Sequence, residues 1–215
     1  MQATPSRPAS SEPRHPWALA LLVVLVGFCA LRPIWNIDWG WHLAVGRWIL
    51  DEGRLPDRDW WSAGGPAGPW RSFQWLWQVS AAALERAGGL GALRLAHMAW
   101  VTLTFAMGWV VLRRRGFGPA ETLLVLAALL VVWHDRLRVR PHVVNLTGLL
   151  LLTGAVLRPT WRPWVGALAA FALTWLWSGL HMGGALLGVV ALTGVALATL
   201  LLSRTRGPRP SDASL

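Results

Sequence analysis

Six long runs of apolar residues, separated by segments that carry arginine, constrain the fold of this 215-residue chain most strongly. A bilayer core is about 30 Å thick, so a helix that crosses it needs about 20 mostly apolar residues. Since 54% of the side chains are hydrophobic and only 14% are charged, most soluble enzymes are excluded. We predict an all-α polytopic transmembrane helical bundle with about six spans, at residues 17–35, 90–112, 120–133, 143–157, 164–180 and 183–202.

Arginine in the short loops predicts the orientation of the bundle. Arg113, Arg114 and Arg115 form the densest cluster, and they lie inside if the amino terminus is inside. Under that topology the inner side has ten arginines and three acids, whereas the outer side has ten arginines and seven acids. We therefore expect a protein of the bacterial cytoplasmic (inner) membrane with both termini cytoplasmic. The polar ends, residues 1–16 and 204–215, are predicted to be a disordered leader and tail around a membrane domain at 17–203.

Residues 36–89 are long, mixed in polarity and rich in Trp, Pro and Gly, which predicts an outer loop. Within it, residues 40–52 have apolar side chains at helical spacing and are expected to form an amphipathic interfacial helix. Residues 73–87 form a second helical stretch, either interfacial or a seventh span. A seventh span would place the 113–115 arginines outside, so the interfacial interpretation is favoured. The 17 tryptophans and the absence of tyrosine fit an aromatic belt at a membrane surface.

Ionisable residues from three outer segments are expected to converge on one membrane face. The last outer turn contributes His181, the first loop contributes Asp38, His42 and Arg47, and the connection between spans three and four contributes His134, Asp135, Arg136, Arg138, Arg140 and His142. Ionisable groups near hydrocarbon are costly unless they are paired or line a wet cavity. Guanidinium forks and imidazoles can bind a phosphate or diphosphate. A facing carboxylate can bind a divalent metal ion or act as a base toward an acceptor hydroxyl.

Each of these residues also has a structural interpretation. Asp38 precedes a helix and can act as its N-cap, to which His42 can hydrogen-bond back. Arg47 and Asp51 have the spacing of an i,i+4 ion pair. The segment 134–142 can anchor lipid headgroups.

Three further features have structural interpretations that we favour. His97 in mid-span is expected to be a packed, hydrogen-bonded group. Cys29, the single cysteine, is expected to be a small buried hydrophobe. The glycines at 179, 183, 184 and 188 predict close packing of the last two spans.

The order of several segments resembles bacterial polytopic membrane proteins of unassigned role, whose layout is similar to the N-terminal module of type-C (GT-C fold) glycosyltransferases. These segments are residues 38–50, 55–59, 69–76, 113–116, 140–142 and 180–184. The resemblance implies a polyprenyl-phosphate-linked sugar as donor, Asp38 as the catalytic acid residue, and a donor phosphate near Arg138, Arg140 and His142. The chain departs from that superfamily in having one acid at the key position, where many members have a pair, and fewer spans.

Two functions follow from these observations. The first is a glycosyltransferase-like protein that handles a lipid-phosphate-linked sugar at the outer membrane face, with Asp38 as catalytic residue and His42, Arg138, Arg140, His142 and His181 as substrate-binding residues. The second is a non-catalytic membrane subunit or lipid-binding scaffold that needs a partner membrane protein. A transporter is a weaker third. Nucleic acid is not an expected partner, because the arginines form no continuous basic stripe.

Overall fold

The computed structural model describes residues 16–31, 33–34, 38–61, 69–156 and 162–205, and these are organised by helices. The predicted leader and tail lie outside the described residues, except for Pro16, Arg204 and Thr205, which belong to helices. The fold is all-α, as predicted. Its helices are α1 (Pro16–Ala30), α2 (Trp39–Glu52), α3 (Trp75–Arg114), α4 (Pro119–Trp133), α5 (Val144–Val156) and α6 (Pro163–Thr205), with short 3-10 helices η1 (His134–Arg136) and η2 (Pro141–Val143).

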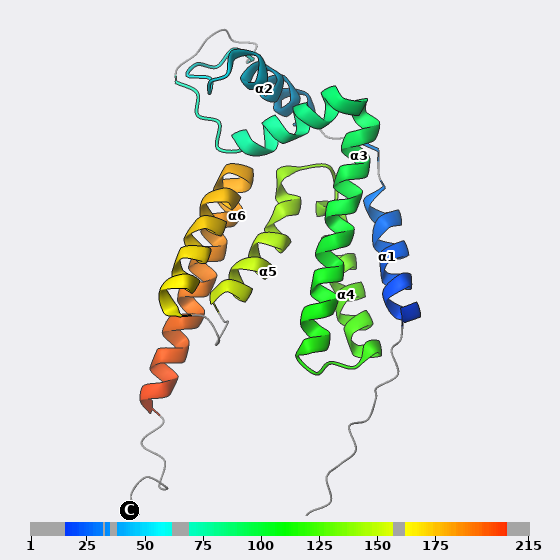
Figure 1. Ribbon diagram of the computed structural model, residues 1–215, viewed down its shortest axis with the longest axis vertical. Coiled ribbons are helices and arrows are strands. Elements are labelled where there is room, and N and C mark those ends of the chain that lie inside the picture. The colour runs from blue at the N-terminus through cyan, green and yellow to red at the C-terminus, as the bar shows by residue number, and fades with distance from the viewer. Residues whose placement is uncertain (1–15, 32, 35–37, 62–68, 157–161, 206–215) are drawn as a thin grey trace, which may run out of the picture.

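The helices form a bundle with a cap across one end (Figure 1). We define the cap as residues 38–61 and 69–87, which contain α2 and the first arm of α3. The end of α4, both 3-10 helices and the start of α5 also lie at the capped end (Figure 1). The start of α1 and the end of α6 lie at the opposite end. Chain segments that are far apart in sequence are thereby brought together under the cap.

Helix α3 consists of two arms that meet at a glycine pair. Gly88 (φ −161°, ψ 27°) and Gly89 (φ 66°, ψ −166°) are not helical, and the positive φ of Gly89 is a conformation that side-chain-bearing residues rarely adopt. The first arm, up to residue 87, crosses the end of the bundle, and the second arm, from residue 90, runs along it (Figure 1). The two helices predicted at 73–87 and 90–112 are therefore confirmed as helices.

Helix α6 reverses direction at His181 (φ −159°, ψ 90°), and Figure 1 shows its two arms side by side. A Cβ atom at Gly188 would lie 2.5 Å from the ring of Trp177. In an unbroken helix, residues eleven apart would be separated by about 16 Å along the axis. The two helices predicted at 164–180 and 183–202 are thus confirmed as antiparallel arms.

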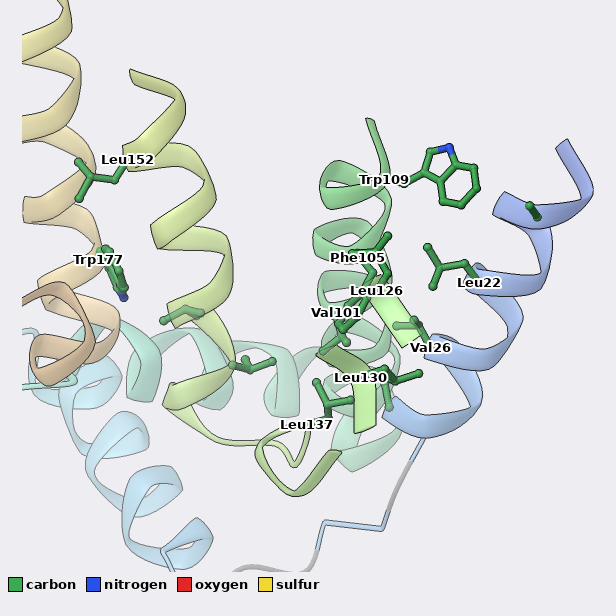
Figure 2. Close-up of a cluster of buried hydrophobic side chains, with 14 of the residues drawn as sticks. Leu22, Val26, Val101, Phe105, Trp109, Leu126, Leu130, Leu137, Leu152 and Trp177 are labelled. Atoms are coloured by element: carbon green, nitrogen blue, oxygen red, sulfur yellow. The ribbon is translucent and has the colours of Figure 1, made fainter. Parts of the chain in front are cut away.

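The core of the bundle lies mainly between α1, the second arm of α3 and α4. Helix α1 buries Ala18, Leu22, Val26 and Ala30, which lie on one face because they are four residues apart. Figure 2 shows Leu22 and Val26 directed toward side chains from α3 and α4, chiefly Val101, Phe105, Leu126 and Leu130. Cys29 packs against this core, as predicted for a small hydrophobe, but it is partly and not fully buried.

Close contacts with glycine join α5 to α6. The ring of Trp177 lies between Gly148 of α5 and Gly188 of the second arm of α6, where a Cβ atom would approach within 2.4 and 2.5 Å, respectively. The indole Nε1 of Trp177 donates to Asn145 Oδ1 at 3.2 Å. Gly179 packs on Trp75 of the cap. Close packing of the last two spans is confirmed at Gly188, which meets the Trp177 ring. Gly179 instead contacts the cap, Gly184 contacts Asn145 of α5, and Gly183 has only an ordinary contact with the His181 ring.

Ion pairs and close backbone packing hold α2 on the first arm of α3. Arg47 contacts Glu85 through two hydrogen bonds, of 2.6 and 3.2 Å, and Arg86 contacts Asp51 at 2.5 Å. The predicted i,i+4 pair of Arg47 with Asp51 is therefore wrong, because both side chains have partners on the neighbouring helix. A Cβ atom at Gly46 would lie 2.0 Å from a backbone oxygen of α3, so glycine is required for this close approach.

Four partly buried tryptophans cluster in the cap. Adjacent rings of Trp41, Trp70, Trp61 and Trp48 have centroids 5.8 to 6.3 Å apart, and the Arg54 guanidinium lies 5.1 Å from the Trp48 ring.

Two helical ranges are long and apolar enough to cross a membrane, Trp75–Arg114 and Trp164–Gly194. The α1 helix ends at Ala30, five residues before the predicted end of the first span, and α4 and α5 have 15 and 13 residues. The described helices thus match the predicted spans in order. Two ranges among them are long and apolar enough to cross a membrane.

Candidate functional site

The candidate site lies under the cap, where three chain segments meet. Asp38 and His42 come from the start of α2, Arg140 and His142 from the start of η2, and His181 from the reversal in α6. Because all these elements begin, end or turn at the capped end of the bundle, the five predicted residues lie near one another. We call these five residues the capped-end site.

Asp38 and Arg140 form the charged contact of the site. Asp38 Oδ2 lies 3.6 Å from Arg140 Nη2, and their side chains are 48% and 28% exposed. Asp38 occupies the N-cap position of α2, but its side chain makes no capping hydrogen bond. The carboxylate is therefore directed to a tertiary partner, and the N-cap interpretation does not account for it.

His42 is buried beside this ion pair. Its Nδ1 lies 3.3 Å from Nε2 of Gln78, whose Oε1 accepts a hydrogen bond from Ser72 Oγ. The Gln78 amide therefore donates to Nδ1. Burial lowers the pKa of His42 to about 4, with an opposing effect of the Asp38 carboxylate and further lowering by His142 and Arg140. His42 is neutral at physiological pH, and it joins α2 to α3 in place of bonding back to the helix start.

His142 and His181 face each other across the junction of η2 and α6. Their ring centroids are 4.4 Å apart, with an angle of 47° between the planes. Nδ1 of His181 accepts a hydrogen bond from the backbone N–H of Gly184 at 2.9 Å, which fixes the reversal of α6. Burial, then the charges of Arg136 and Arg140, lower the pKa of His142, and Asp38 opposes this shift.

Both histidines line an open pocket with a volume of about 520 Å³. The pocket also receives polar side chains from Arg136 and Asn145. Its remaining walls are Val132, Trp133, Gly183 and Leu187.

Arg136, which belongs to the predicted polar cluster between spans three and four, lines this pocket. Arg138 does not line the pocket; its exposed guanidinium lies 3.4 Å from Asp135. Of the predicted substrate-binding residues, His142 and His181 line the pocket, whereas Arg138, like His42 and Arg140, does not. The reason is local: Arg136 ends the 3-10 helix that continues α4, whereas Arg138 lies between the buried residues Leu137 and Val139 on the way to η2.

Sequence reasoning also missed Gln78 and Asn145. Gln78 lies in the helical stretch predicted at 73–87, and it is 1% exposed and contacts His42. Asn145 matches a glycosylation sequon, which its apolar surroundings made uninformative. Amide side chains inside apolar runs are costly to bury without partners, and that cost is the signal that could have identified Asn145.

Among the residues that the structure describes, no three His, Cys, Asp or Glu side chains are grouped so that they could hold a metal ion. The polar groups of the site are instead cations, imidazoles, an amide and one carboxylate, a set suited to binding an anion next to a single acid–base group. Comparisons with protein-family models, curated proteins and solved structures found no match to this chain.

Proposed function

We propose that this chain is a bacterial cytoplasmic membrane protein of about six spans that binds a lipid-phosphate-linked sugar at the capped end and transfers the sugar. The proposed activity resembles that of type-C glycosyltransferases. The observation that carries the proposal is the pocket at the rim of the bundle, which has a cationic, imidazole-rich side and an apolar side.

The outer surface of the bundle supports the membrane location. Besides its buried stripe, α1 exposes apolar side chains such as Val24 (66%) and Phe28 (80%). A helix whose whole surface is hydrophobic is unfavourable in water and is suited to contact with lipid. Arg113, Arg114 and Arg115 lie at the end of α3 that is distant from the cap, so the cap belongs on the outer face by the positive-inside rule.

The pocket matches the two chemical halves of a lipid phosphate. Arg136, His142, Asn145 and His181 offer N–H groups to phosphate oxygens. Val132 and Leu187, which are 77% and 70% exposed, extend the same pocket onto the apolar outer surface, where a prenyl chain would lie.

Asp38 supplies the acid–base group for sugar transfer. In the proposed step the Asp38 carboxylate accepts the proton of an acceptor hydroxyl, and the acceptor oxygen bonds to the anomeric carbon of the sugar. The bond from that carbon to the phosphate oxygen breaks, and the lipid phosphate leaves with the bonding electrons. Arg140 holds the Asp38 side chain toward the site, and Arg136 and His142 bind the leaving phosphate.

Binding of farnesyl phosphate, with farnesol as its uncharged counterpart, tests the pocket. In nanodiscs, the chain should retain farnesyl phosphate at least about tenfold better than farnesol, since charge-assisted hydrogen bonds are worth about 1.5–3 kcal/mol. Arg136→Ala should remove most of this preference, whereas Arg138→Ala, a matched change on the same loop outside the pocket, should leave it. Equal losses in both variants would contradict the proposed pocket.

A non-catalytic lipid-binding scaffold is the second candidate, and the Asp38–Arg140 contact favours it because the carboxylate already has a partner. The two functions differ in the behaviour of Asp38→Asn. For the enzyme, release of farnesyl phosphate from a farnesyl-phosphate-linked hexose should fall by at least about 100-fold, while farnesyl phosphate binding is retained. If the unmodified chain binds but releases nothing until a partner membrane protein is added, the scaffold is correct.

A further inference from the structure

A second cavity lies between the cap and the bundle, separate from the pocket that His142 and His181 line. Its volume is about 120 Å³. One wall is the first arm of α3, with Trp77 and Leu84, and the opposite wall is the second arm, with Leu93, His97 and Trp100. Val143, Val144 and Leu180 close it toward α5 and α6. The cavity therefore occupies the angle that the Gly88–Gly89 kink opens between the two arms.

His97 places a hydrogen-bond acceptor in this apolar region. The side chain is only 4% exposed, and its Nε2 lies 2.8 Å from the carbonyl oxygen of Leu137. Because a carbonyl oxygen can only accept, Nε2 carries the hydrogen, and the neutral ring has Nδ1 as an acceptor. Nδ1 is buried and has no hydrogen-bond partner among the described residues. The hydrogen bond to Leu137 confirms the predicted structural role of His97, but it uses one nitrogen only.

A buried acceptor without a donor costs about 1–3 kcal/mol, so this site favours anything that brings a donor. The size and lining of the cavity indicate which class of molecule could bring that donor. Ser80 adds the one hydroxyl to walls that are otherwise apolar or aromatic. A closed apolar protein cavity of about 150 Å³ binds benzene. This space is partly open, and its similar volume and mostly apolar walls suit a small ring.

We propose that this cavity binds a small, mainly apolar molecule with a single hydroxyl, such as a phenol, whose O–H donates to Nδ1 of His97. Its ring packs between Trp77 and Trp100, and it fills the angle between the two arms of α3. The ligand thereby braces the cap against the bundle. This site needs no phosphate and no sugar, so it is independent of the proposed transferase.

The test uses 4-fluorophenol and fluorobenzene, which differ in the hydroxyl, followed by ¹⁹F NMR on the full chain in nanodiscs. Empty nanodiscs at the same lipid concentration correct for partitioning into the bilayer. We expect a saturable bound signal for 4-fluorophenol, with an affinity about 3- to 10-fold higher than that of fluorobenzene, as one neutral buried hydrogen bond contributes. Equal affinities, or no saturable signal from 4-fluorophenol, would overturn the proposal.

Filling the cavity provides the structural control. Ala96 lines the cavity, and Ala99 lies one turn away on the exposed face of the same arm. Ala96→Leu should abolish the saturable signal, and Ala99→Leu should retain it. Leu84→Trp fills the cavity from the cap side and replaces Ala96→Leu if the latter does not fold. Persistence of the signal in a folded, cavity-filled variant would place the ligand elsewhere and refute the assignment.

Discussion

The long helices of the bundle and the cap across their end differ in the polar contacts that supplement their apolar packing. In the bundle, α1, α3 and α4 meet through interlocking aliphatic and aromatic groups such as Leu22 and Phe105. In the cap, apolar side chains such as Val45 and Ala82 are buried as well, but ion pairs, a histidine–glutamine hydrogen bond and, directly beneath the cap, a pair of imidazole rings add to that packing. Apolar packing is insensitive to pH and salt, whereas charged and titratable contacts are not. The two regions should therefore respond to different perturbations.

The largest expected effect comes from truncating the bundle core. Phe105 is 2% exposed, and Phe105→Ala leaves a cavity that α1 and α4 cannot close, which should reduce the free energy of unfolding by about 3–5 kcal/mol. Leu103→Ala is the control, because Leu103 is 63% exposed on the same helix and should cost less than about 1 kcal/mol. The measurement is reversible unfolding in mixed micelles, repeated at two salt concentrations. If the loss of unfolding free energy changed with salt, the bundle core would not differ from the cap in its sensitivity to salt.

A smaller effect is expected at the contact between α5 and α6, where Gly148 packs against the flat ring of Trp177. Gly148→Ala puts a methyl group 2.4 to 2.6 Å from three atoms of the Trp177 ring, so the ring must move, at a cost of about 2 kcal/mol. Gly154→Ala lies in the same helix with nothing within 4 Å of the added carbon, and it should be neutral or slightly stabilising.

The same pair of variants tests whether the glycine contacts support the pocket. Displacement of Trp177 disturbs its hydrogen bond to Asn145, which lines the pocket, so Gly148→Ala should also weaken farnesyl phosphate binding. Both effects are measured in one preparation. If stability falls but binding does not, the α5–α6 contact and the pocket are independent.

The cap should respond to pH through His42. Its pKa is about 4 in the folded chain and about 6.5 when unfolded, so between these values the unfolded state binds one more proton. Stability from this group is complete above pH 6.5 and is lost as the pH falls toward 4, by up to about 1.4 kcal/mol per pH unit. His42→Gln should flatten this part of the profile in unfolding measurements. An unchanged slope in that variant would assign the acid sensitivity to another group.

The smallest expected effect is that of the ion pair between α2 and α3. Arg47 and Glu85 are 48% and 20% exposed, so solvent screens their attraction and a double-mutant cycle with Arg47→Gln and Glu85→Gln should give about 0.5–1 kcal/mol. That coupling should shrink at 1 M salt, where the Debye length is about 3 Å. The Phe105→Ala loss is the internal reference, since it should not change with salt.

Much of the helical layout could be predicted from the sequence, because each boundary has a local cause. Gly88 and Gly89 interrupt α3, and the glycine-rich turn around His181 interrupts α6, at the positions expected from composition. The convergence of Asp38, His42, Arg140, His142 and His181 was also expected, since antiparallel helices bring alternate connections to the same end. Helix ends and chain reversals depend on a few neighbouring residues, and such information is present in the sequence.

The partners of individual side chains could not be predicted in this way. Spacing along α2 paired Arg47 with Asp51, but each instead contacts α3, and the sequence did not show that Arg136 lines the pocket while Arg138 does not. Helical spacing says which residues share a face and leaves open how far that helix is rotated or shifted against its neighbour.

The amino-acid sequence by itself determined an all-α chain with apolar helices, glycine breaks and a set of polar residues at one end of the bundle. Only the tertiary structure decided that Gln78 holds His42, that Arg136 lines the pocket, and that the angle between the arms of α3 encloses a cavity beside His97. The physical reason is that apolar periodicity and backbone freedom act within a few residues, whereas these contacts depend on how closely separate helices approach. Gly46 allows α2 to approach the backbone of α3 closely, and Gly148 allows α5 to approach the Trp177 ring.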